Sequence, residues 1–151
     1  MNRRLGLAVI GVGMAAKPHA LALNDLRDQI DVRGVYARST HAASTFCDTY
    51  NFPQANDLEA LASDPSVEAA LLITPPDARA DLVSLFADHG KHILSEKPLE
   101  RTAEAAQSIV DTCVKTNVLL GVVFQHRFRA ASEALTKLIA QRTLGEIRMV
   151  R

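Results

Sequence analysis

The chain has 151 residues, of which 48% are hydrophobic and 23% charged, and these values are ordinary for a globular domain with a core of its own. Lysine and arginine together number 17, as do aspartate and glutamate, so the formal net charge is zero. This balance gives no electrostatic reason to expect a nucleic-acid or membrane-surface partner, and no apolar stretch approaches the about 20 residues that span a bilayer.

The first 17 residues resemble a secretion signal, because basic residues precede an apolar stretch that ends in small residues. Gly6, Gly11 and Gly13 are too many glycines for a helical signal core, and cleavage would remove the first predicted strand. Cys47 and Cys113 lack metal-ligand spacing and fall on the apolar stripes of predicted helices. We therefore expect two buried, reduced thiols, no metal site and a cytoplasmic protein.

Signals for strands and helices alternate along the chain. Apolar runs predict six strands, at residues 5–10, 32–37, within 51–56, and at 69–73, 92–94 and 119–124. Apolar residues at helical spacing lie between them, and four of these helices are expected to begin at Ser39 or Thr40, Asp57, Asp77 and Thr102. Strands separated by helices imply right-handed crossovers, so we expect an α/β fold with a doubly wound parallel sheet of the Rossmann type.

The last part of the chain has a different pattern. Residues 131–141 predict a helix, and residues 144–146 predict a turn. The run at 147–150 then alternates as in a new strand. Because a domain seldom ends within a fresh strand, we expect more chain to follow in the parent protein.

A glycine-rich turn follows the first predicted strand. Gly11, Gly13 and Ala16 fit the pattern G-x-G-x-x-A, in which the first glycine permits a tight turn, the second lets a pyrophosphate approach the backbone, and the third position packs the helix on the strand. Free N–H groups at the helix start, at Met14 and Ala15, would hold the phosphates. In isolation the pattern also fits a purely structural turn, but its place after the first strand of an α/β chain favours a nucleotide.

The end of the second predicted strand indicates which nucleotide binds. An NAD site usually has a carboxylate there, about 20 residues past the turn, whereas this chain has Arg38, Ser39 and Thr40. A planar cation and hydroxyl groups suit the 2′-phosphate of NADP, so we prefer NADP over NAD. The alternative is a solvated Arg38 and a Ser39 that only caps a helix. The missing carboxylate also disfavours a methyltransferase that uses S-adenosylmethionine.

Four further segments complete a resemblance to a known family. They are Ile73–Pro76 (ITPP), Gly90–Pro98 (GKHILSEKP), Arg127–Phe128 and Leu144–Ile147 (LGEI). Together with the glycine turn, these segments resemble the Gfo/Idh/MocA oxidoreductases, the family of glucose–fructose oxidoreductase and inositol dehydrogenase. The resemblance covers essentially the whole chain.

The resemblance implies a division into two domains. Residues 1–124 correspond to the NAD(P)-binding Rossmann domain of the family. Residues 125–151 correspond to the connection and the first elements of a second, α+β domain, which supplies much of the substrate pocket and often the subunit interface. The resemblance therefore implies a homo-oligomer in full-length form.

The resemblance also assigns roles to individual residues. Thr74 and Pro75 match the segment that lines the nicotinamide half of the cofactor. Glu96, Lys97 and Pro98 match the E-K-P motif, whose lysine lies beside the nicotinamide and the reacting hydroxyl or carbonyl of the substrate, and whose X-Pro bond is often cis. Lys97 is thus the expected catalytic residue, in a hydride transfer between the nicotinamide and a sugar-like small molecule. The alternative is a regulator that binds the dinucleotide without redox chemistry, as some relatives do.

Two features depart from the family. Arg79 stands where the family often has a histidine, which favours either an anionic substrate or a solvated arginine on a helix. The usual acid/base histidine belongs to the second domain and has no equivalent here. We do not assign that role to His126, and we interpret His19, His41, His89 and His92 as surface or structural residues.

Overall fold

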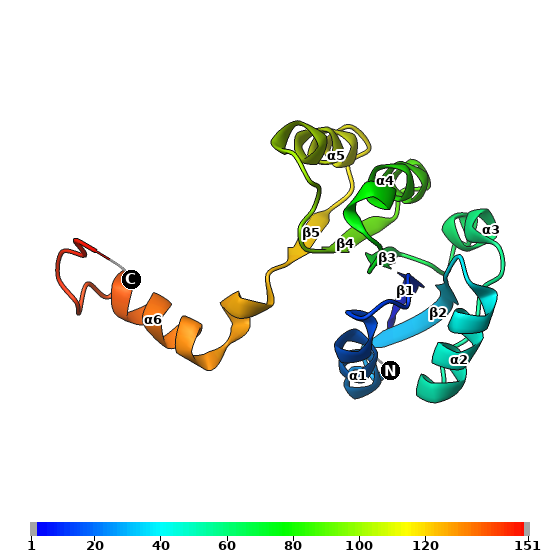
Figure 1. The fold of residues 1–151 in the computed structure, drawn as a ribbon, viewed down its shortest axis with the longest axis horizontal. Coiled ribbons are helices and arrows are strands. Elements are labelled where there is room, and N and C mark those ends of the chain that lie inside the picture. Colours follow the sequence, from blue (N-terminus) through cyan, green and yellow to red (C-terminus); the bar gives the residue numbers. More distant parts are fainter. Residues whose placement is uncertain (1–2, 150–151) are drawn as a thin grey trace.

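Five parallel strands form one sheet in the order β2-β1-β3-β4-β5 (Figure 1). The structure, a computed structural model, describes residues 3–149. The strands in that part of the chain are β1 (Leu5–Ile10), β2 (Ile30–Tyr36), β3 (Ala69–Leu72), β4 (His92–Glu96) and β5 (Leu120–Val123). All neighbouring pairs are parallel, which confirms the predicted class of fold.

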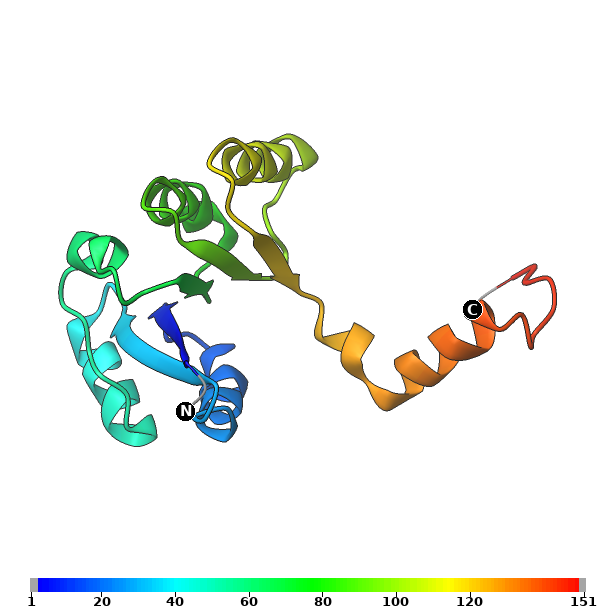
Figure 2. The same cartoon turned by 180° about the vertical axis from the view of Figure 1, so that it is seen from behind.

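Helices follow the strands and cover both faces of the sheet (Figure 2). The α-helices are α1 (Ala16–Asp25), α2 (Thr40–Tyr50), α3 (Leu58–Ser63), α4 (Arg79–Asp88), α5 (Ala103–Lys115) and α6 (Ala130–Ala140). Two short 3-10 helices, η1 (Pro76–Ala78) and η2 (Gln125–Phe128), lie between them. Within residues 3–149, no helix has both the length and the apolar character that crossing a membrane requires.

The continuous apolar run of β1 is explained by burial on both sides. Ala8 and Ile10 belong to the core cluster shared with α3, α4 and α5, whereas Leu7 and Val9 belong to the cluster shared with α1 and α2. Successive side chains of a strand point to opposite faces, so both sets must be apolar. Phe86 of α4 is fully buried in the first cluster, and burial of such a side chain contributes about 1.5–3 kcal/mol.

The strand order fixes where a ligand can bind. The chain leaves β1 for β2 on one side and then returns to pair β3 with the other side of β1. Crossovers that diverge in this way open a crevice beyond the carboxyl ends of the two central strands. The turns after Ile10, Leu72 and Glu96 meet at that edge of the sheet.

The predicted strand within residues 51–56 is wrong in its extent. Only Gln54 makes a parallel bridge, with Val35 of β2. Asn51 ends α2 in the left-handed conformation, at φ 56°, and Pro53 has no N–H to donate to a ladder. Most of this segment therefore forms the turn out of α2.

The predicted strand at 147–150 is also not found in the described residues. Residues 147–149 have no regular structure, and Val150 lies outside the described part of the chain. A strand needs a neighbour to pair with, and none runs beside residues 147–149. The preceding η2 and α6 extend away from the sheet (Figure 1), and α6 has no buried residue.

Three of the four predicted helix starts are confirmed. Ser39 and Asp57 cap α2 and α3, and the Thr102 hydroxyl accepts a hydrogen bond from the Ala105 amide at the start of α5, at 3.1 Å. Asp77 is the exception, because it lies inside η1, two residues before α4 begins. Its carboxylate forms an ion pair with Arg101, 3.1 Å away.

Candidate functional site

The glycine turn lies against two neighbouring strand ends. Gly11 has φ +97°, a conformation that favours glycine, and its amide donates to the Tyr36 carbonyl at 2.8 Å. A Cβ on Gly11 would lie 3.0 Å from the carbonyl carbon of Ile73 and 3.2 Å from Cγ2 of Thr74. The turn is therefore packed between the carboxyl ends of β2 and β3, and a side chain has no room here.

The second half of the turn is open. A Cβ on Gly13 would meet nothing within 4 Å, and Met14 and Ala15 are exposed. Ala15 occupies the N-cap position of α1, and among the described residues no side chain forms a capping hydrogen bond with this helix. Ala16 is buried against the sheet, as the third position of the motif requires. An uncapped helix start beside bare backbone is the arrangement that binds phosphate groups.

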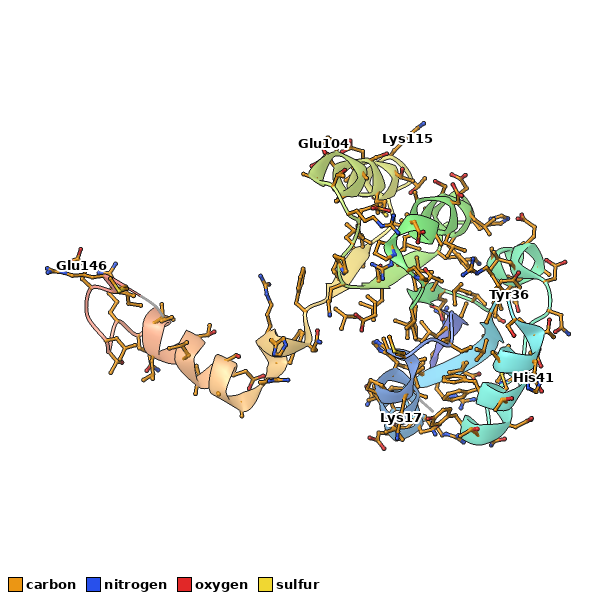
Figure 3. All side chains as sticks on the ribbon, viewed as in Figure 1. Lys17, Tyr36, His41, Glu104, Lys115 and Glu146 are labelled. Atoms are coloured by element: carbon orange, nitrogen blue, oxygen red, sulfur yellow. The ribbon has the colours of Figure 1, made fainter. Side chains whose placement is uncertain are left out.

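The carboxyl end of β2 leads directly into the start of α2. Arg38 and Ser39 are both exposed, and the Ser39 hydroxyl accepts a hydrogen bond from the Ala42 amide at 3.3 Å. Figure 3 marks the last residue of β2, Tyr36, and a residue in the first turn of α2, His41. Ser39 is thus a cap, as one interpretation of the sequence required, while its own O–H remains able to donate.

Thr74 shows a buried polar group without a partner. Among the described residues its Oγ1 is buried and has no hydrogen bond, whereas its methyl carbon faces Gly11. A buried hydroxyl without a partner costs free energy, so this atom suits a polar group supplied by a ligand. Pro75, the next residue, is exposed at the rim.

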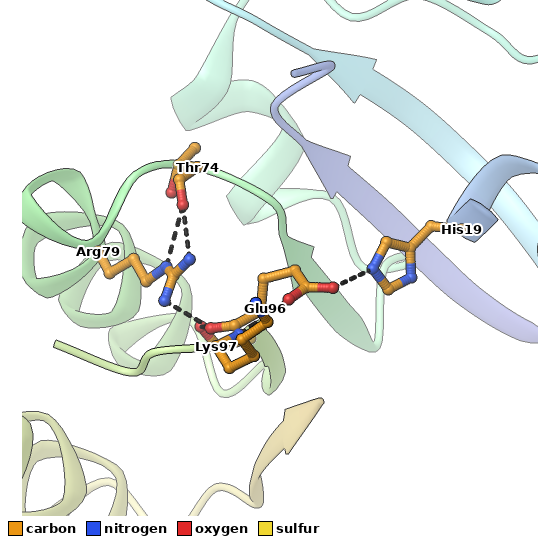
Figure 4. A network of polar contacts seen from close by, with 6 residues as sticks. His19, Thr74, Arg79, Glu96 and Lys97 are labelled. Carbon is orange, nitrogen blue, oxygen red and sulfur yellow. Dashed lines mark hydrogen bonds and ion pairs between the residues drawn. The ribbon is translucent and has the colours of Figure 1, made fainter. Parts of the chain in front are cut away.

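The E-K-P segment begins at Glu96, the last residue of β4, and a side-chain contact joins it to α1. Nε2 of His19 is 2.8 Å from Oε1 of Glu96 (Figure 4), and Oε2 of Glu96 accepts from the Lys97 amide at 2.9 Å. The Lys97–Pro98 peptide bond is cis, as the resemblance implies. Lys97 itself is exposed, so its ammonium group is free to reach a ligand at the sheet edge.

Arg79 contradicts both interpretations of the sequence. It is neither solvated nor directed at a ligand, because only 2% of it is exposed. Its Nε and Nη2 donate to the Thr74 carbonyl at 3.1 and 2.7 Å, and its Nη1 donates to the carbonyls of Glu96 and Pro98 (Figure 4). Burial lowers the pKa of Arg79, and the carboxylates of Glu96 and Glu100 oppose that shift.

His19 was interpreted as a surface or structural residue, and neither interpretation of Arg79 placed it in a buried network of this kind. Helical spacing carried a signal for both of them. His19 lies three residues after the buried Ala16, and Arg79 lies four residues before the buried Val83, so each falls on the covered face of its helix. A polar residue on that face needs partners, and these are the Glu96 carboxylate for His19 and backbone carbonyls at the strand ends for Arg79.

A parallel sheet with a glycine turn at its switch point defines the class of dinucleotide-binding α/β domains. A family model described as "Oxidoreductase family, NAD-binding Rossmann fold" (GFO_IDH_MocA) matches residues 5–124. The chain therefore belongs to this oxidoreductase family, as the motifs indicated, and its cofactor is of the NAD(P) class.

Individual relatives agree with this membership. The chain is 31% identical over 150 residues to inositol 2-dehydrogenase of Rhizobium meliloti (strain 1021), which covers 99% of the chain and 44% of the relative. It is 32% identical over 111 residues to D-xylose 1-dehydrogenase (NADP(+)) 2 of Haloferax volcanii, covering 73% of the chain and 34% of the relative.

A solved structure supports the fold. An NAD binding oxidoreductase from Klebsiella pneumoniae superposes with a TM-score of 0.84 at 22% identity, over 95% of this chain and 40% of that protein. The chain spans less than half the length of all three of these proteins.

Proposed function

We propose that the whole protein is an NAD(P)-dependent dehydrogenase or reductase and that residues 1–124 are its cofactor-binding domain, with 125–151 leading into a second domain. The observation that carries the proposal is the convergence of three segments at one sheet edge. The glycine turn, Thr74 and Lys97 follow β1, β3 and β4, which are neighbours in the sheet. Ligands of open α/β sheets bind at this edge.

The residues present fit the cofactor. Gly13 leaves its backbone accessible, and the N–H groups of Met14 and Ala15 open α1 without a side-chain cap within the described residues. The unpartnered Thr74 hydroxyl and the exposed Pro75 face the same edge. When bound, NAD(P) supplies the hydride donor or acceptor of the reaction.

Lys97 is the residue we propose to act on the substrate. Its ammonium group would donate a hydrogen bond to the reacting hydroxyl or carbonyl oxygen and stabilise the negative charge that develops there. The Oε2 atom of Glu96 accepts a hydrogen bond from the Lys97 amide. The relatives named for inositol and xylose support a sugar-like or related small-molecule substrate.

Two further proposals concern the oligomeric state and the location of the whole protein. We propose a homo-oligomer, because the second domain of the family often forms the subunit interface. Cys47 and Cys113 are free and buried, which supports a reducing location such as the cytoplasm.

We further propose that NADP is preferred over NAD. Arg38 and Ser39 are exposed where the adenosine ribose would lie, and the flanking residues, Ala37 and Thr40, carry no carboxylate. The names of the similar proteins include both NADP(+) and NAD, so the proposal rests on Arg38 and Ser39. A guanidinium pairs well with a 2′-phosphate, and a bare ribose hydroxyl gains little from it.

Titration of the chain with NADPH and NADH, followed by nicotinamide fluorescence, tests both the proposed cofactor binding and the proposed preference for NADP. We expect NADPH to bind about tenfold more tightly, which corresponds to about 1.4 kcal/mol, and Arg38→Ala to remove most of that difference. Arg148→Ala is the matched control, because Arg148 is exposed and pairs with Glu146 beyond α6. No binding of either cofactor would refute the proposed function, and equal affinities would refute the NADP preference alone.

A further inference from the structure

We infer that Arg79 is the positioning residue of Lys97: its buried guanidinium joins the segment after β3 to the segment after β4 and fixes the backbone on both sides of the lysine. The inference rests on the role proposed above for Lys97 and extends it to a residue outside the binding edge. Arg79 does not reach substrate or cofactor, because its side chain is buried.

The hydrogen bonds of Arg79 have a specific arrangement. Two of them converge on the Thr74 carbonyl, at 3.1 and 2.7 Å. The others go to the carbonyls of Glu96 and Pro98, with Leu99 O at 3.5 Å. Lys97 lies between two of these acceptors, so its backbone cannot shift along the strand direction without breaking a bond to the guanidinium.

A second tie holds the same lysine from the opposite side. The Lys97 amide donates to the Glu96 carboxylate at 2.9 Å, and that carboxylate contacts His19 of α1 at 2.8 Å. Lys97 is thus anchored from α4 through Arg79 and from α1 through Glu96 (Figure 4). Since α1 begins at the glycine turn and Arg79 also bonds the Thr74 carbonyl, both anchors connect the lysine to segments that we propose to hold the cofactor.

The chemistry of the site requires arginine. A guanidinium carries five N–H donors in a rigid plane, and at least four are used here. A lysine at 79 would offer three donors from one point, and a histidine at most two. Either substitution would leave part-buried carbonyls of Thr74 or Pro98 without their guanidinium donor, and lost hydrogen bonds of this kind cost stability.

The carbonyl groups around the Arg79 guanidinium also explain why the side chain stays charged despite burial. Four carbonyl dipoles point at the cation, and Glu96 and Glu100 lie close enough to favour its charged form. A neutral substitute of similar length would lose this complementarity and leave the carbonyls opposed to one another.

The test measures the backbone order of Lys97 directly. NMR relaxation of the cofactor-free 151-residue chain is compared for the wild type, Arg79→Lys and Arg101→Lys. Arg101 is the matched control, because it is an exposed arginine that pairs with Asp77 in the same region. We expect order parameters at Lys97 and Leu99 near the rigid value of about 0.85 in the wild type and the control, and below about 0.6 in Arg79→Lys.

A residue with a merely stabilising role would give a different result. Arg79→Lys would then lower the melting temperature and leave the order of Lys97 at the wild-type value, and this outcome would overturn the inference. NADPH is added as a second probe: in Arg79→Lys the shift of the Lys97 amide should be lost while that of Gly13 is retained. A wild-type chain in which NADPH shifts neither amide would refute the proposed function, and the order parameters would still decide the role of Arg79.

A measurement on the unchanged chain keeps the inference falsifiable if Arg79→Lys does not fold. The side-chain N–H protons of Arg79 should exchange with water at least about tenfold more slowly than those of the exposed Arg101, because they are buried and bonded. Exchange at the same rate for both arginines would overturn the inference.

Discussion

Gly11 and Gly13 belong to the same turn, but each lacks a side chain for a different reason. Gly11 has positive φ and lies against Ile73 and Thr74, so its lack of a side chain serves the fold. Gly13 has open space where a Cβ would point, so its lack of a side chain serves a ligand. The motif G-x-G-x-x-A predicts both reasons but not the contacts of Gly11, because these are made with residues more than 60 positions away.

Alanine substitutions should separate the two tasks. We expect Gly11→Ala to lower the free energy of unfolding by about 1–3 kcal/mol, because it adds backbone strain and a close contact. Gly13→Ala should change stability by less than about 0.5 kcal/mol but weaken NADPH binding about tenfold, because the methyl group would occupy the approach of the pyrophosphate. Urea unfolding and fluorescence titration measure the two effects.

Gly90 provides the control for this pair. It also has positive φ, at +70°, but a Cβ there would meet nothing within 4 Å. Gly90→Ala therefore measures the conformational cost without the contact, and it should destabilise the chain less than Gly11→Ala. A Gly13→Ala chain with unchanged NADPH affinity would show that the open side of the turn does not hold the phosphates.

At the scale of elements, α2 and α5 cover opposite faces of the sheet, and each carries one cysteine on its covered face. Cys47 is 6% exposed and Cys113 is 2% exposed, as the apolar stripes predicted. Burial raises the pKa of both thiols, and the charge of Asp48 adds to the effect at Cys47. The folded state therefore favours the protonated thiols.

Both cysteines should be inert while the helices stay docked. At pH 8 in the native chain, we expect a thiol reagent to label them at least about 10²-fold more slowly than in the urea-unfolded chain, because reaction requires the thiolate and local opening. A pKa raised in the folded state adds stability below the ordinary thiol pKa of about 8.5, and this stability is lost as the pH rises through the raised pKa.

The corresponding pH measurement is urea unfolding from pH 7 to pH 10. A double Cys47→Ala, Cys113→Ala chain is the control, since the part of the decline due to the thiols should be absent from it. Fast labelling of the native wild type would show that α2 or α5 separates readily from the sheet.

Helix starts show what local sequence predicts and what it does not. Ser39, Asp57 and Thr102 cap helices because each acts within three residues of itself, on a scale that the sequence displays directly. The prediction that Asp77 caps a helix was wrong, because the 3-10 helix that begins at Pro76 delays the start of α4. The Asp77 carboxylate instead pairs with Arg101, a residue of another segment.

At the scale of the whole molecule, the sheet was predictable because strands buried on both faces must be continuously apolar. The motifs indicated which segments form the site, and the strand order places these segments beside one another. The buried network did not, because it joins His19 to Glu96, 77 positions away, and Arg79 to Glu96, 17 positions away. A single sequence shows a charged residue on a helix and gives no sign of which carbonyls it will meet across the sheet.

The last prediction concerns activity and the extent of the chain. The chain spans less than half the length of the relatives it matches, and the family resemblance assigns the main acid/base histidine to the second domain. We therefore expect the 151-residue chain to bind NADPH but to oxidise inositol or xylose at least about 10²–10⁴-fold more slowly than a full-length relative, the loss that removal of a general acid/base typically causes. Inositol 2-dehydrogenase of Rhizobium meliloti, assayed for nicotinamide absorbance under the same conditions, is the reference. Lys97 and the residues that hold it are all present in this chain. Turnover near that of the reference would therefore mean that Lys97 alone manages the substrate proton. It would refute the assignment of the main acid/base group to a second domain.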